Sequence, residues 1–179
     1  MPGKMPFQSK NLHRQWAIPY AVAAATIALS VYYLPNYFFL ERATAEHAAY
    51  LLNILGAHVQ TYIVGQNAFL ENIRVVKDCT GVQVVAVFLG LLLPVPSAPW
   101  RMKAITLATA AASVYVAKVL RIALEFWLVY NGILPWSLAH YPMSLLLGIV
   151  GVAVLVLATD RLLPEFGDFL LGTIRPLGK

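Results

Sequence analysis

Cysteine is almost absent from this sequence, because its 179 residues include a single one, Cys79. One cysteine excludes an internal disulfide framework and any metal site built from several cysteines. A lone cysteine in an apolar chain usually behaves as a small packing residue. The residues around Cys79 therefore have to decide between a structural and a reactive thiol.

Charged residues are also scarce, at 12% of the sequence, whereas 60% of the residues are hydrophobic. Soluble domains carry about 25% charged residues, so this composition argues against one. The net charge of +5 is spread along the chain, and no basic run is dense enough to suggest nucleic-acid binding. The composition predicts a single integral membrane domain over residues 1–179.

The sequence is rich in long apolar stretches. We expect an all-α membrane protein, because helices satisfy their own backbone hydrogen bonds in lipid. Four transmembrane helices are predicted, at about residues 16–40, 79–95, 104–130 and 143–159. In the more polar segment 41–78, apolar spacing predicts an amphipathic helix lying on the bilayer. Two β-rich runs around a Gly/Asn turn in the same segment predict a small β-hairpin.

Basic residues predict the orientation of the chain. They occur without acidic residues in the N-terminal segment and in the 96–103 connector, while loop 131–142 has no lysine, arginine or acidic residue. The positive-inside rule then places both termini and the connector in the cytoplasm, and 41–78 and 131–142 outside. The prediction is a multi-pass protein of the plasma membrane.

This orientation brings three reactive side chains to one level near the outer surface. Cys79 opens the second span and His140 precedes the fourth. Arg121 lies about 25 Å beyond Ala104 along the third span, close to the outer rim of a hydrocarbon core about 30 Å thick. An arginine within a span costs about 2.5–3.5 kcal/mol, so Arg121 is a candidate functional residue.

The residues alone leave two interpretations open. In the catalytic one, Cys79 is a nucleophile whose thiolate is favoured by the cations Lys77, Arg121 and His140. Arg121 then stabilises an oxyanion or a lipid phosphate, and His140 transfers protons. In the structural one, Cys79 is a packing residue and His140 is an ordinary loop histidine. Arg121 then either pairs with Glu125 one helical turn on or extends its charged end to the membrane interface.

A metal site is a weaker alternative. His47, His58, His140 and Cys79 supply enough ligands for zinc only if the outer segment folds over the bundle. The catalytic interpretation requires neither a metal nor an organic cofactor.

At these residues the sequence resembles the exosortase/archaeosortase family of membrane cysteine transpeptidases. That family has a Cys-(Ser/Thr)-Gly motif at the start of one span, an arginine in an Asn-x-x-Arg-Ile pattern on the next, and a histidine opening the following one. The matching segments here are "DCTGV" (Cys79, Thr80, Gly81), "KVLRIA" (Arg121, Ile122) and "AHYPM" (His140). The resemblance covers about residues 50–160. Lys118 stands where the family usually has asparagine, and the chain is shorter than many relatives.

The resemblance implies a protein-sorting reaction. The partner would be a membrane-anchored protein whose C-terminal signal consists of a short motif, a spanning helix and a basic tail. Cys79 would attack a peptide bond outside the membrane, Arg121 would stabilise the oxyanion, and His140 would transfer the proton. The substrate-binding candidates are the motif residues Thr80, Gly81 and Lys118. The acyl group would then pass from the thioester to a membrane lipid.

Two other functions remain as alternatives. A membrane cysteine peptidase would use the same residues but release a free acid. A non-catalytic scaffold or transport component with four spans would use Arg121 and Glu125 as a structural ion pair.

Overall fold

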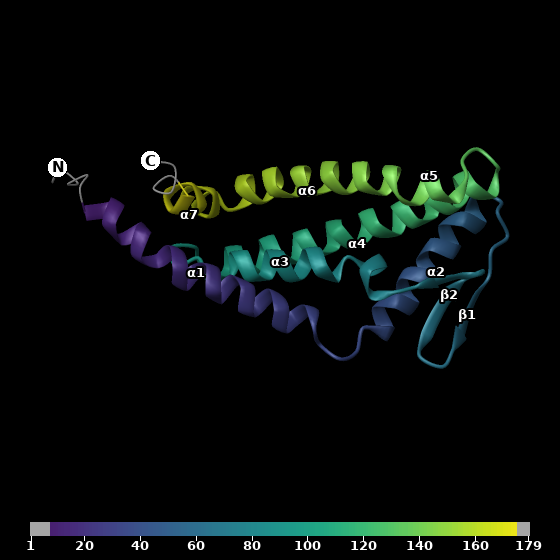
Figure 1. Cartoon of the computed structure of the whole chain (residues 1–179), viewed down its shortest axis with the longest axis horizontal. Coiled ribbons are helices and arrows are strands. Elements are labelled where there is room, and N and C mark those ends of the chain that lie inside the picture. Colours follow the sequence, from purple (N-terminus) through teal and green to yellow (C-terminus); the bar gives the residue numbers. More distant parts are fainter. Residues whose placement is uncertain (1–7, 175–179) are drawn as a thin grey trace.

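The computed structural model describes residues 8–174 and is mostly helical (Figure 1). Its helices are α1 (Gln8–Tyr32), α2 (Phe38–Ile54), α3 (Val82–Leu92), α4 (Trp100–Tyr130), α5 (Trp136–His140), α6 (Pro142–Leu162) and α7 (Pro164–Ile174). A small sheet, of β1 (Thr61–Val64), β2 (Asn67–Leu70) and β3 (Ile73–Val75), and the 3-10 helix η1 (Lys77–Thr80) separate α2 from α3. The predicted helical class is confirmed.

The helices form an elongated bundle in which α1, α3, α4 and α6 follow the long axis (Figure 1). The start of α1 and helix α7 lie together at one end, where they are in contact. Helix α2, the sheet and α5 gather towards the other end (Figure 1). Segments 41–78 and 131–142, predicted to share one side of the membrane, therefore lie at the same end of the bundle.

Within residues 8–174, two helical segments are long and apolar enough to cross a membrane: α4, and Trp136–Leu162, which joins α5 and α6. They correspond to the third and fourth predicted spans. The first and second predicted spans correspond to the shorter apolar helices Ala17–Tyr32 and Val82–Leu92. A bundle with four membrane crossings therefore stays a prediction.

Several predicted boundaries are wrong, for reasons of local backbone. The expected first span, 16–40, is interrupted, because α1 ends at Tyr32 and α2 begins only at Phe38. Pro35 lies between them, and proline removes a helical hydrogen bond and disfavours helix in the residue before it. The expected second span, 79–95, is reduced to α3, whose 11 residues extend about 16 Å. The expected loop 131–142 contains α5.

The sheet confirms the predicted hairpin and extends it by a third strand. Strands β1 and β2 pair antiparallel around a turn containing Gly65 (φ +62°), and β2 pairs antiparallel with β3. Ala68, Leu70 and Val75 are buried in a cluster with apolar residues of α2. Because η1 follows β3 almost at once, this packing fixes where η1 begins.

Helix α4 contributes to two hydrophobic clusters among residues 8–174. Its Ala110 and Val114 belong to a cluster with residues of α1, α3, α6 and α7. Its Val119 and Ala123 belong to a second cluster with residues of α2 and the sheet. The two clusters meet along α4 between Val114 and Val119, beside η1.

Lys103 is a buried lysine at the other end of α3. Lys103 is the last residue of the 96–103 connector that the basic residues predict to be cytoplasmic, but it lies within α4 and is 8% exposed. Its ammonium group donates a hydrogen bond of 2.8 Å to the carbonyl of Leu93. A cation is favourable there, because the last carbonyls of a helix carry partial negative charge.

Replacing Gly90 with alanine is expected to separate α1 from α3. A Cβ at Gly90 would lie 2.3 Å from the carbonyl oxygen of Ala24, and a backbone atom cannot move aside cheaply. Overpacking of this kind costs about 1–3 kcal/mol. The measurement is thermal unfolding in detergent, with Gly148→Ala in α6 as the control, because nothing lies within 4 Å of a Cβ there. Equal melting temperatures for the two variants would contradict the close contact of the two helices.

Candidate active site

Cys79 lies in η1, between the sheet and α3. Its backbone N–H donates a hydrogen bond of 2.8 Å to the carbonyl of Val76. The side chain is half-buried and packs against the second hydrophobic cluster. The expectation that Cys79 opens a long helix is wrong, because Gly81 adopts a left-handed conformation (φ +82°) and α3 begins only at Val82.

The end of α1 holds η1 from one side. The ammonium group of Lys77 donates a hydrogen bond of 3.2 Å to the carbonyl of Tyr32 and lies 3.7 Å from the centroid of the Tyr32 ring. The Tyr32 hydroxyl donates to the carboxylate of Asp78 at 3.1 Å. Lys77 was a candidate cation for the thiol, but its charge is directed towards α1.

Lys118 of α4 holds η1 from the other side. Its ammonium group donates a hydrogen bond of 3.3 Å to the carbonyl of Asp78 and interacts electrostatically with Cys79 and Arg121. An asparagine amide at this position could also donate to a carbonyl, so lysine retains that ability and adds a charge. Lys118 therefore places a positive charge beside the turn that carries Cys79.

Thr80 and Gly81 both make contacts that stabilise the turn between η1 and α3. The Thr80 hydroxyl is buried and donates a hydrogen bond of 2.6 Å to the carbonyl of Lys77. A Cβ at Gly81 would lie 2.6 Å from Cγ1 of Val114, so glycine lets α4 approach the backbone. These contacts give both residues a structural role, and their contact with a substrate stays a prediction.

Arg121 and His140 meet at one buried carboxylate, that of Glu125. Nε of Arg121 lies 2.6 Å from Oε1 of Glu125, and Nδ1 of His140 lies 3.2 Å from Oε2. The Glu125 side chain is only 4% exposed, whereas that of His140 is 37% exposed. The His140 ring also stacks on Trp136, with centroids 5.0 Å apart. The pair of Arg121 with Glu125 considered from sequence is present, and the His140 side chain joins it.

The connecting role of Glu125 was missed from sequence, although a signal for it existed. Glu125 is the only acidic residue between Cys79 and Thr159. An isolated carboxylate in such an apolar region must find cationic partners, because burial of an unpaired charge is costly. The candidate partners in this region include His140 as well as Arg121.

Lys118, Arg121 and Glu125 form a polar row on α4, about 10 Å long at 1.5 Å per residue. Lys118 contacts η1 at one end of the row, and Glu125 contacts α5 at the other. Within residues 8–174, no hydrogen bond joins the Cys79 thiol to Arg121 or His140. The structure thus brings Arg121 and His140 together, and the convergence of Cys79 with them stays a prediction.

The other histidine positions considered for zinc do not gather with Cys79. Nδ1 of His47 lies 2.7 Å from the hydroxyl oxygen of Tyr115. In the part of the chain that the structure describes, no group of three or more His, Cys, Asp or Glu residues is placed to hold a metal ion.

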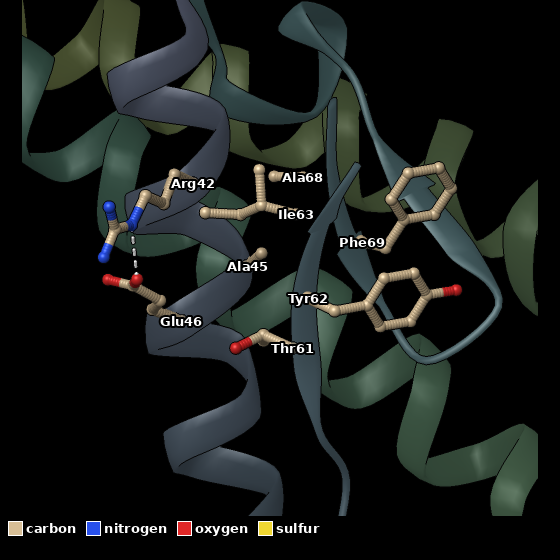
Figure 2. Close-up of a pocket in the computed structure, with 8 residues that line it drawn as sticks. All are labelled: Arg42, Ala45, Glu46, Thr61, Tyr62, Ile63, Ala68 and Phe69. Atoms are coloured by element: carbon tan, nitrogen blue, oxygen red, sulfur yellow. Dashed lines mark hydrogen bonds and ion pairs between the residues drawn. The ribbon is translucent and has the colours of Figure 1, made fainter. Parts of the chain in front are cut away.

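A cavity of about 270 Å³ lies elsewhere, between α2 and the β1–β2 hairpin. Figure 2 shows the ion pair of Arg42 with Glu46 on its α2 side and the stacked rings of Tyr62 and Phe69 on the hairpin. None of the predicted site residues lines this cavity. It is therefore distinct from the polar row on α4.

Comparison with known proteins gives one family. The model of the family described as transmembrane exosortase (Exosortase_EpsH) matches residues 7–159. The matched range includes η1, α4 and α5, and with them the candidate residues Cys79, Arg121 and His140. No curated protein and no solved structure matches the chain.

Proposed function

This chain belongs to the transmembrane exosortase family, a family of membrane protein-sorting enzymes, and we propose that it is a transpeptidase with Cys79 as its nucleophile. The proposed target is a membrane-anchored protein with a C-terminal sorting signal, and the proposed acceptor is a membrane lipid. The observation that carries the proposal is the contact of Arg121 and His140 with the buried carboxylate of Glu125. Arg121 and Glu125 lie on the same face of α4 as Lys118, which contacts the Cys79 turn.

In the first half of the proposed reaction, the Cys79 thiolate attacks the carbonyl carbon of the target peptide bond. A carbon–sulfur bond forms, and the carbonyl oxygen becomes an oxyanion. Nε of Arg121 donates its hydrogen bond to Glu125. The terminal amino groups of the guanidinium are therefore the donors that would bind the oxyanion. When the carbon–nitrogen bond breaks, His140 gives a proton to the departing amine and a thioester remains.

In the second half, a nucleophilic group of a lipid head attacks the thioester carbonyl. His140 takes the proton of that group, the carbon–sulfur bond breaks, and the Cys79 thiolate is restored. The target is then joined to the lipid. Water must be restricted during this step, because hydrolysis of the thioester would compete with transfer.

We further propose that the reaction takes place at the outer face of the plasma membrane, with both termini in the cytoplasm. The basic N-terminal segment supports this orientation through the positive-inside rule. Support also comes from the arrangement of the bundle, because α2, the sheet and α5 lie towards the end opposite α7 (Figure 1).

Trapping the thioester tests this proposal directly. The enzyme is co-expressed with a tagged surface protein from the same genome that ends in an apolar helix and a basic tail. After acid quenching, intact-mass measurement is expected to find the enzyme enlarged by the acyl portion of the target, and hydroxylamine is expected to remove it. The Cys79→Ala variant is the control and should carry no adduct.

The product separates the remaining alternatives. Transpeptidation gives a lipid-linked target, whereas a peptidase gives a target that ends in a free acid. If the target is processed without any adduct on Cys79, the proposed mechanism is wrong. A scaffold or transport component would give neither product.

A further inference from the structure

We propose that Glu125 is a positioning residue that sets both the protonated nitrogen of His140 and the orientation of Arg121. This inference rests on the proposed function, because it assigns how the two predicted catalytic side chains are held. Each oxygen of the carboxylate has its own partner: Oε1 faces Nε of Arg121 and Oε2 faces Nδ1 of His140.

The contact with His140 determines which ring nitrogen is available for chemistry. A carboxylate only accepts hydrogen bonds, so Nδ1 must carry the proton that points at Oε2. The other nitrogen, Nε2, is then directed away from Glu125 and is free to exchange protons with a reacting group. A carboxylate that fixes the tautomer of a histidine in this way serves the same purpose in hydrolase triads.

The contact with Arg121 determines which guanidinium nitrogens are available. The guanidinium group is planar and its donors are fixed relative to one another, so engaging Nε orients the whole group. Arg121 and Glu125 are four residues apart on α4, and their 2.6 Å contact therefore belongs to one rigid helix. His140 belongs to α5, so the carboxylate also fastens α5 to α4.

Burial makes this arrangement different from an ordinary surface ion pair. Arg42 and Glu46 on α2 have the same spacing and the same 2.6 Å separation, but their side chains are 53% and 48% exposed. The Glu125 side chain is 4% exposed. A charge-assisted contact is strengthened away from water, whereas exposed pairs contribute little to stability. Glu46 is therefore a matched control for Glu125.

The experiment compares Glu125→Gln with Glu46→Gln, using two measurements. A glutamine at position 125 has one acceptor oxygen and one NH2 group where Glu125 has two acceptor oxygens. Because arginine only donates, the oxygen should face Nε of Arg121 and the NH2 group should face Nδ1 of His140, which must then accept instead of donate. Turnover of the tagged surface protein is expected to fall about 10²–10⁴-fold in Glu125→Gln. Turnover should remain at the wild-type value in Glu46→Gln.

The second measurement is independent of turnover. Protein labelled with ¹⁵N-histidine is studied by NMR in detergent, and the His140 signals are assigned from their loss in His140→Gln. The wild-type protein is expected to have a proton on Nδ1 of His140, and Glu125→Gln to have lost it. An unprotonated Nδ1 in the wild type would overturn the inference even if the variant did not fold. So would a folded Glu125→Gln protein whose His140 spectrum and turnover equal those of the wild type.

The Cys79→Ala variant distinguishes an error in the role of Glu125 from an error in the proposed function. If Cys79→Ala processes the target normally, the transpeptidase proposal is wrong, whatever the spectrum of His140 shows. If Cys79→Ala is inactive while Glu125→Gln is fully active, the transpeptidase proposal stands and the role of Glu125 is wrong.

Discussion

Replacing Cys79 with alanine is expected to reduce processing of the tagged surface protein by about 10⁴-fold or more, the loss typical of removing a covalent nucleophile. The sequence contains no second cysteine that could substitute for it. The measurement is the fraction of target converted with time, read from the mass of the product. Because the remaining side chains still bind and orient the target, a small residual rate is compatible with the mechanism.

Loss of activity in this variant has to be distinguished from loss of structure. The side chain of Cys79 is only half-buried, and the hydrogen bond of its residue to Val76 is made by the backbone. Alanine should therefore leave the melting temperature nearly unchanged. Processing at the wild-type rate by a correctly inserted Cys79→Ala protein would rule out a thioester mechanism.

Replacing Arg121 with alanine is the second change with a large expected effect. If Arg121 donates to the oxyanion, turnover should fall about 10²–10³-fold. Because the oxyanion exists in the transition state and not in the bound substrate, the loss should appear in kcat with little change in KM. Arg121→Lys keeps the positive charge but not the planar set of donors, so its activity should be intermediate.

Arg42→Ala is the matched control, because Arg42 makes the corresponding contact with Glu46 on the exposed surface of α2. This variant should keep the wild-type turnover. A raised KM with unchanged kcat in Arg121→Ala would contradict the oxyanion role and assign Arg121 to substrate binding. Thermal unfolding should be measured together with the kinetics, because Arg121→Ala leaves the buried Glu125 without its arginine partner.

The presence of a helix in each long apolar stretch could be predicted from the sequence more securely than the residues at which the helix begins and ends. The apolar stretch 104–130 corresponds to α4, which begins four residues earlier, at Trp100. The end of α1 and the start of α3 could not be obtained from hydropathy, because no charged residue lies between Tyr32 and Phe38 or between Cys79 and Val82. Those two boundaries depend on Pro35 and on the left-handed conformation of Gly81, which are properties of the backbone.

The candidate site was predictable only where its contacts are local. The spacing of Arg121 and Glu125 predicts their ion pair, since residues four apart share one face of a helix. The contact of Glu125 with His140 could not be predicted in the same way. It depends on how the chain returns after α4, and the short α5 was expected to be loop. The contact between Lys77 and Tyr32 likewise requires the packing of α1 beside η1.

The lysine-to-carbonyl contacts at the helix interruptions bear on how the chain is assembled during translation. Lys77 donates to Tyr32, Lys103 to Leu93 and Lys118 to Asp78, so each acceptor precedes its lysine in the chain. A nascent polypeptide emerges from its N-terminus, so each carbonyl has left the ribosome before the ammonium group that binds it. None of these ammonium groups therefore has to wait for an acceptor that has not yet been synthesised.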